Sequence, residues 1–226
     1  MMSENDFDKK TSAVSNWVSI LLGLPWYEIA GEVWKIGRKI MRGLASEGMY
    51  ELLDYESTLE LLDKEGKRAH YKKRMKIRYL QDDNIAFQDY AWGDGEILLD
   101  YQTSRGQPVD RYKSGYKTYI LLSLREVRNR GDIDEFDISW NFRNGFLKPD
   151  GYWSTGVSHQ MKRMKINVIF PKSRLPRRLV LEENNRRRTC NLGIEFQKRL
   201  SDGRLEVSWE TEKPHLYEVY VMRWEW

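Results

Sequence analysis

Residues 135–142 read Glu-Phe-Asp-Ile-Ser-Trp-Asn-Phe, and apolar side chains occupy every second position of this stretch. Successive side chains of a β-strand point to opposite faces, so the alternation predicts a strand with one buried face and one solvated face. The same period of two recurs at 163–170 and at 204–210. These stretches indicate a mainly β body.

Turn signals separate the predicted strands. Asp-Gly or Asn-Gly dipeptides, which are typical of tight hairpin turns, stand at 94–95, 144–145, 150–151 and 202–203. Their spacing predicts about nine or ten short strands. We therefore expect residues 50–226 to form an antiparallel β-sandwich of the immunoglobulin-like type.

The residues before this body follow a helical period instead. Pro25 suits the first turn of a helix, so residues 12–48 are predicted to form two helices that meet at this proline, after a flexible N-terminus at 1–11. Apolar residues of the second helix recur at spacings of three and four, which makes it amphipathic. Its apolar face is a candidate surface for docking a protein partner or a second copy, and the alternatives are packing on the sandwich or lying on a membrane surface. The candidate docking residues are Trp26, Ile29, Val33, Trp34, Ile40 and Met41.

Composition sets limits on the class of protein. The chain has 226 residues, of which 40% are hydrophobic and 13% aromatic, so it can bury a sizeable core and is not a disordered chain. A single cysteine, Cys190, excludes an internal disulfide framework and favours a cytoplasmic location. The most apolar stretch, 17–34, contains a proline and two glutamates, so we expect no transmembrane helix.

Signatures of catalysis are missing from the sequence. His70, His159 and His215 do not have the spacing of a metal site, and no phosphate-binding loop, dinucleotide fingerprint or serine-hydrolase motif is present. We therefore predict a non-enzymatic protein with no catalytic residues, metal or cofactor. The alternative to this prediction is an enzyme whose acidic site residues are dispersed along the sequence.

Basic residues gather in two places. Lys72, Arg74, Lys76 and Arg78 alternate with apolar residues and so share one face of one predicted strand, which we call the basic ridge. Residues 161–188 carry ten basic and two acidic side chains, a net charge of +8 in a chain whose net charge is +4. The candidate anion- or nucleic-acid-binding residues in this segment are Lys162, Arg163, Lys165, Arg177, Arg178, Arg186, Arg187 and Arg188.

Two interpretations of the basic ridge stay open. It could neutralise the phosphates of a nucleic acid or another polyanion. Alternatively, it is a solvated sheet face whose cations pair with acids such as Glu56 and Glu60 on the neighbouring strand.

The C-terminal half carries a resemblance to a known group. The strand at 119–125, the Phe170-Pro171 pair and the aromatic ending at 217–226 resemble uncharacterised bacterial immunoglobulin-like β-sandwich modules that are attached to prokaryotic defence and signalling proteins. This resemblance implies a non-catalytic sensor or interaction module and transfers no functional residue. The first hypothesis is thus a non-enzymatic binding module, and the alternative is a nucleic-acid-binding protein that uses a basic sheet face.

Overall fold

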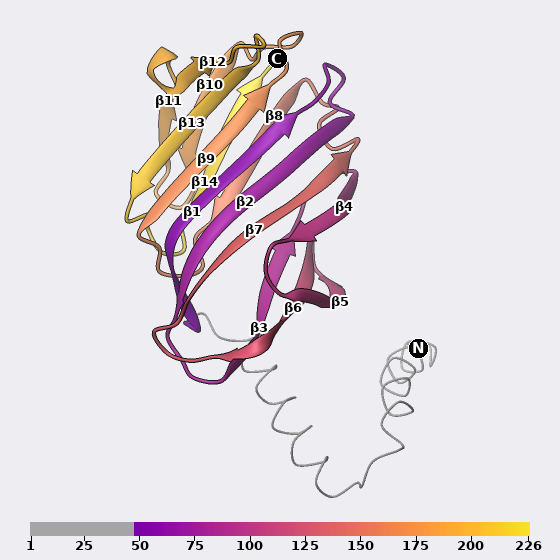
Figure 1. Cartoon of the computed structure of the whole chain (residues 1–226). Helices are drawn as coiled ribbons and strands as arrows, with labels where there is room; N and C mark the ends of the chain where they lie inside the picture. The colour runs from indigo at the N-terminus through magenta and orange to yellow at the C-terminus, as the bar shows by residue number, and fades with distance from the viewer. Residues whose placement is uncertain (1–47) are drawn as a thin grey trace, which may run out of the picture. The chain divides into compact units, whose positions relative to one another are not determined.

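The computed structural model describes residues 48–226, and the regular secondary structure of this part of the chain is almost entirely β-strand (Figure 1). The mainly β class predicted from the alternating stretches is therefore confirmed. The predicted flexible N-terminus and the candidate docking residues Trp26, Ile29, Val33, Trp34, Ile40 and Met41 lie outside the described residues. No helix within residues 48–226 is long and apolar enough to cross a bilayer.

The strands form three sheets. The large sheet has the order β12 (Gln197–Arg199), β13 (Leu205–Glu212), β9 (Arg163–Phe170), β1 (Tyr50–Leu61), β2 (Arg68–Tyr79), β7 (Ile133–Arg143) and β4 (Glu96–Thr103). The second has the order β11 (Arg188–Asn191), β10 (Arg178–Glu183), β14 (Val219–Glu225) and β8 (Asp150–Gly156). The third has the order β3 (Asn84–Ala91), β6 (Lys117–Arg128) and β5 (Gln107–Ser114), and a single 3-10 turn, η2 (Ile194–Phe196), precedes β12.

Both smaller sheets lie against one face of the large sheet, as in a sandwich (Figure 1). Phe170 of β9 packs edge-on against Trp224 of β14 with ring centroids 5.3 Å apart. Phe87 of β3 stacks on Phe136 of β7 at 4.4 Å. The core therefore lies between the large sheet and the two small ones, and it buries the apolar face predicted for 135–142.

The large sheet corrects the expectation of a purely antiparallel sandwich. β1 pairs with β2 in antiparallel fashion, but it pairs with β9 in parallel fashion, with Tyr55 opposite Met164 and Leu59 opposite Val168. A parallel pair needs a long crossover connection, and here strands β2 to β8 supply it. Side-chain alternation tells which face of a strand is buried but not the direction of its neighbour, so the sequence could not reveal this pair.

The predicted number of strands is also wrong, because the described residues contain fourteen. Several of the additional strands lack a clear period of two in burial. β5 is exposed at nearly every position, and β11 is exposed along its whole length. Such short or edge strands bury no apolar face and leave no periodic signal in the sequence.

Candidate functional site

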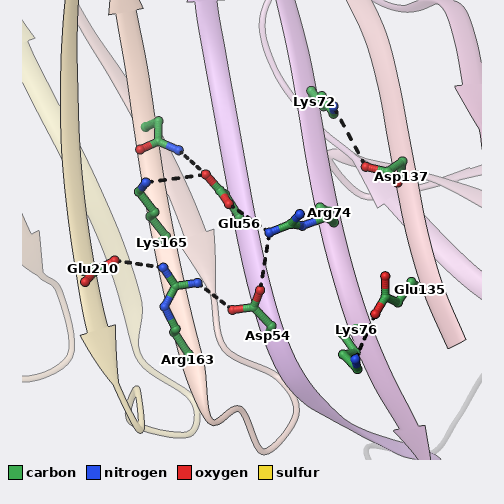
Figure 2. Close-up of polar contacts among 11 residues, drawn as sticks. Asp54, Glu56, Lys72, Arg74, Lys76, Glu135, Asp137, Arg163, Lys165 and Glu210 are labelled. Carbon is green, nitrogen blue, oxygen red and sulfur yellow. Dashed lines mark hydrogen bonds and ion pairs between the residues drawn. The ribbon is translucent and has the colours of Figure 1, made fainter. Parts of the chain in front are cut away.

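The basic ridge lies on the outer, solvated face of β2, as its alternation predicts. Its cations are paired with acids on both neighbouring strands (Figure 2). The Arg74 guanidinium lies 3.4 Å from Glu56 of β1, and the Lys76 ammonium lies 2.9 Å from Glu135 of β7. Arg78 pairs with Glu51 at 3.0 Å.

Two cations from the 161–188 segment join the same network. Arg163 of β9 bridges Asp54 of β1 at 2.7 Å and Glu210 of β13 at 2.9 Å, and Lys165 lies 3.6 Å from Glu56 (Figure 2). With Lys72 beside Asp137 at 4.0 Å, the six cations of the network meet six carboxylates. The charges of this network are thus balanced.

The solvated-face interpretation named Glu56 and Glu60 as partners of the ridge cations, and the structure agrees with it in part. Glu56 does pair with the ridge, through Arg74. Glu60 instead pairs with Arg204, which precedes β13. Arg204 lies beyond β9, on the side of β1 where the parallel pair forms, and the sequence could not reveal that arrangement.

The remaining basic candidates do not form one patch. Arg178 pairs with Glu225, and Arg186 pairs with Glu183. Arg177 lies just before β10, whereas Arg187 and Arg188 follow its far end, so the length of β10 separates them. Lys162 precedes β9.

A second polar feature lies in the interior, on the opposite face of β2. Lys73 points inward and forms an ion pair with Asp89 of β3, and the two residues are only 6% and 2% exposed. Tyr101 of β4 donates a hydrogen bond of 3.0 Å to the other carboxylate oxygen of Asp89. The Lys73 ammonium also lies 5.4 Å from the centroid of the Trp140 ring, within the range of a cation–π interaction.

Lys73, Asp89 and Trp140 line an inner chamber of about 80 Å³ between the large sheet, β3 and β8. Its wall includes Tyr55 and Tyr71, whose hydroxyl groups are hydrogen-bonded at 3.0 Å. Three other wall residues carry a buried polar atom without a partner among the described residues: Nε1 of Trp140, Nε1 of Trp153 and Oγ1 of Thr155. A buried polar group normally has a hydrogen-bond partner, so these three atoms are exceptions, and all three belong to residues that line one cavity.

Burial affects the pKa of Tyr71 in the chamber wall and of Tyr101, which is hydrogen-bonded to Asp89. It raises the pKa of Tyr71 well above its ordinary value, and the neighbouring Tyr55 hydroxyl adds to that effect. Burial also raises the pKa of Tyr101, and the charge of Asp89 and its hydrogen bond raise that pKa further. Neither hydroxyl can therefore act as a base near neutral pH.

An outer cleft of about 340 Å³ adjoins the chamber, because Trp92 and Trp153 line both. The two indole rings are stacked with centroids 5.3 Å apart. Tyr116 and Tyr152 form exposed aromatic walls of the cleft, and Phe146 lines it as well. Both cavities have aromatic and apolar linings with a few polar groups, which is the usual composition of a small-molecule site.

The sequence analysis did not identify this site. The alternation of side chains could have placed both charged residues on buried faces. Lys73 lies between the inward-pointing Tyr71 and Met75, and Asp89 lies between the inward-pointing Phe87 and Ala91. A charged side chain at a buried strand position requires a partner. Which partner it finds depends on how the sheets stack, and the sequence pattern does not contain that information.

Within the described residues, no group of three or more histidine, cysteine, aspartate or glutamate side chains could hold a metal ion. His70 is hydrogen-bonded to Asn141 at 2.8 Å, and His159 stacks on Tyr50. Cys190 is exposed on β11.

Comparison with known proteins gives distant likenesses only. No family model and no curated protein matches the chain. A proposed protease from Parabacteroides distasonis is 11% identical with a TM-score of 0.47, over 80% of this chain and 41% of that one. A proposed nutrient-binding protein from Legionella pneumophila is 8% identical with a TM-score of 0.48, over 79% and 68%.

The M1 zinc metallopeptidase from Deinococcus radiodurans is 9% identical with a TM-score of 0.44, over 76% of this chain and 42% of that one. This chain thus spans about two fifths of the length of the protease and of the metallopeptidase. All three scores are below 0.5, so these likenesses carry no argument about function.

Proposed function

We propose that this chain is a non-enzymatic binding module, a sensor or adaptor of immunoglobulin-like type, and that its ligand occupies the inner chamber and the outer cleft. The observation that carries the proposal is the set of unpartnered polar atoms of Trp140, Trp153 and Thr155 around one cavity. Leaving a buried polar group unpaired costs about 1–3 kcal/mol, and a bound molecule would recover that cost. A role in a prokaryotic defence or signalling system is part of the proposal and rests on the sequence resemblance.

The chemistry of the chamber supports binding rather than catalysis. Lys73 and Asp89 neutralise each other, and both oxygens of Asp89 already accept hydrogen bonds. The raised pKa values of Tyr71 and Tyr101 keep their hydroxyl groups protonated. A general acid or base works best when its pKa lies near the operating pH, and these tyrosines are far from it.

The nucleic-acid alternative receives no comparable support. The affinity of a basic surface for nucleic acid comes from cations that exchange counterions for phosphates. On this sheet, Arg74, Lys76 and Arg78 already have carboxylate partners. A nucleic acid would have to displace those partners first.

Capture of small molecules tests the proposal. The full-length protein is incubated with a small-molecule extract of its source organism and separated by size exclusion, and retained compounds are identified by mass spectrometry. We expect the wild type to enrich a compound and the double variant Tyr116→Ala, Tyr152→Ala to lose it, because both rings line the outer cleft.

The control is Tyr217→Ala, which removes another exposed tyrosine that lines neither cavity. This variant should retain the compound as the wild type does. Equal retention by the wild type and the double variant, or no enrichment by the wild type, would contradict the proposal.

A further inference from the structure

The unpartnered atoms around the inner chamber are mainly hydrogen-bond donors. Trp140 and Trp153 are 2% and 4% exposed, and an indole N–H can only donate. Thr155, which is 7% exposed, adds a hydroxyl that can donate. In the Tyr55–Tyr71 pair one hydroxyl donates to the other, so the second retains a proton to offer elsewhere.

The carboxylate of the chamber wall already has partners on both oxygens. Asp89 accepts hydrogen bonds from Lys73 with one oxygen and from Tyr101 with the other. The unpartnered donors therefore call for a molecule that brings a hydrogen-bond acceptor.

The charge balance of the chamber favours a neutral acceptor. Among the described residues, Lys73 and Asp89 are the only charged members of its wall, and they form one ion pair. An additional ionic charge would therefore have no opposite charge there to offset its desolvation. The chamber, at about 80 Å³, has room for a small head group. The rest of the ligand must then lie in the adjoining cleft, among the rings of Trp92, Tyr116 and Tyr152.

We propose that the inner chamber binds the uncharged carbonyl group of a ligand, an amide or a ketone, whose planar body lies in the outer cleft. The proposal rests on the proposed function and specifies its ligand class. Planar bodies suit the cleft because aromatic rings favour stacked or edge-to-face neighbours.

Three probes of one shape test the inference: benzamide carries a neutral carbonyl, benzoate is its anionic counterpart, and toluene has no acceptor. Binding to the full-length protein is measured by ligand-observed NMR titration. We expect saturable binding of benzamide, with benzoate and toluene weaker by roughly tenfold or more. Binding of benzoate or toluene as tight as that of benzamide would overturn the inference.

A matched pair of variants locates the binding. Thr155→Val removes the chamber hydroxyl with little change of volume, and we expect it to weaken benzamide binding roughly three- to tenfold. Ser57→Ala also removes a buried hydroxyl that has no partner among the described residues, but Ser57 does not line the chamber, so binding should not change. If Thr155→Val fails to fold, Trp153→Phe removes another donor and serves in its place. Equal benzamide affinity in wild type and either chamber variant would overturn the inference.

Failure of this inference can be distinguished from failure of the proposed function. If the source extract yields a retained compound that depends on Tyr116 and Tyr152, but benzamide has no advantage over benzoate and toluene, the binding function stands and the carbonyl assignment falls. If the protein retains no compound from the extract and does not bind benzamide, both the proposed function and the carbonyl assignment are wrong.

Discussion

Lys73 of β2 and Asp89 of β3 form an ion pair between the large sheet and the three-stranded sheet, and both side chains are almost completely buried. Lys73 is the only cation on β2 that points into the core. Its neighbours Lys72 and Arg74 face solvent and pair across the sheet surface.

Breaking the Lys73–Asp89 pair should destabilise the fold strongly. Lys73→Met leaves Asp89 charged and buried, and we expect the free energy of unfolding to fall by about 3–5 kcal/mol in urea titration. The double variant Lys73→Met, Asp89→Leu removes both charges and should recover most of that loss. Lys76→Met is the exposed control, where loss of the pair with Glu135 should cost at most about 1 kcal/mol. A loss of that small size for Lys73→Met would show that the interior pair contributes little.

The β1–β2 turn should give the stability a pH dependence through Asp63. Burial raises the pKa of Asp63, but hydrogen bonds from the backbone N–H groups of Lys67 and Arg68 and from the Arg68 side chain outweigh it and leave that pKa below its ordinary value. A carboxyl group whose pKa is lowered on folding stabilises the fold above its unfolded pKa, and that contribution disappears as pH falls through the folded pKa.

The test compares wild type with Asp63→Asn across pH. The substitution should lower the free energy of unfolding by about 1 kcal/mol at pH 7, because a charge-assisted hydrogen bond is stronger than a neutral one. The difference should shrink as pH falls below about 4, the ordinary pKa of aspartate. A difference that stays constant down to pH 2 would mean that the charge of Asp63 has no part in it.

The basic ridge should not retain nucleic acid. Duplex and single-stranded DNA and RNA are passed over immobilised full-length protein at physiological salt, and we expect no retention, because the ridge cations already pair with carboxylates. Neutralising the ridge with glutamine at its four positions should leave this result unchanged.

The nucleic-acid alternative predicts the opposite. Wild-type binding would then be tight, would be lost in the glutamine variant, and would weaken with salt at a slope near −0.9 per phosphate contact on duplex DNA. Substitution by glutamate is a poorer test, because it would place like charges beside Glu51, Glu56 and Glu135 and destabilise the sheet by roughly 0.2–1 kcal/mol for each pair.

The sequence patterns predicted the structural features that depend on a single strand. Alternation at Phe136, Ile138 and Trp140 gave the β class and the buried face, and alternation on β2 gave the shared outer face of the ridge. Features that depend on which strands become neighbours could not be predicted. The parallel β1–β9 pair, which supplies Arg163 and Lys165 to the surface network, is one such feature.

The inner chamber is a second feature of that kind. Its wall brings together Lys73 of β2, Asp89 of β3, Trp140 of β7 and Thr155 of β8. Each of these residues looks ordinary within its own strand. Only the stacking of three sheets places their polar atoms around one cavity.

Gly66, in the turn between β1 and β2, should prove essential to the aromatic cleft. Its backbone is left-handed, with φ of +73°, and a Cβ added there would lie 1.9 Å from the carbonyl oxygen of Phe146. The turn and the loop after β7 are held together at this point, because the Phe146 N–H donates a 3.1 Å hydrogen bond to the Gly66 carbonyl. Phe146 in turn lines the outer cleft.

Gly66→Ala should therefore separate the turn from that loop and lower the free energy of unfolding by more than about 2 kcal/mol in urea titration. Gly115→Ala is the matched control: its φ of +59° is also left-handed, but an added Cβ would meet nothing within 4 Å, so only the backbone preference of roughly 1 kcal/mol is lost. We also expect Gly66→Ala to weaken ligand retention by the outer cleft, because Phe146 shifts with its loop, while Gly115→Ala retains the ligand. Equal destabilisation by the two substitutions would mean that the close approach of Gly66 to Phe146 does not constrain the fold.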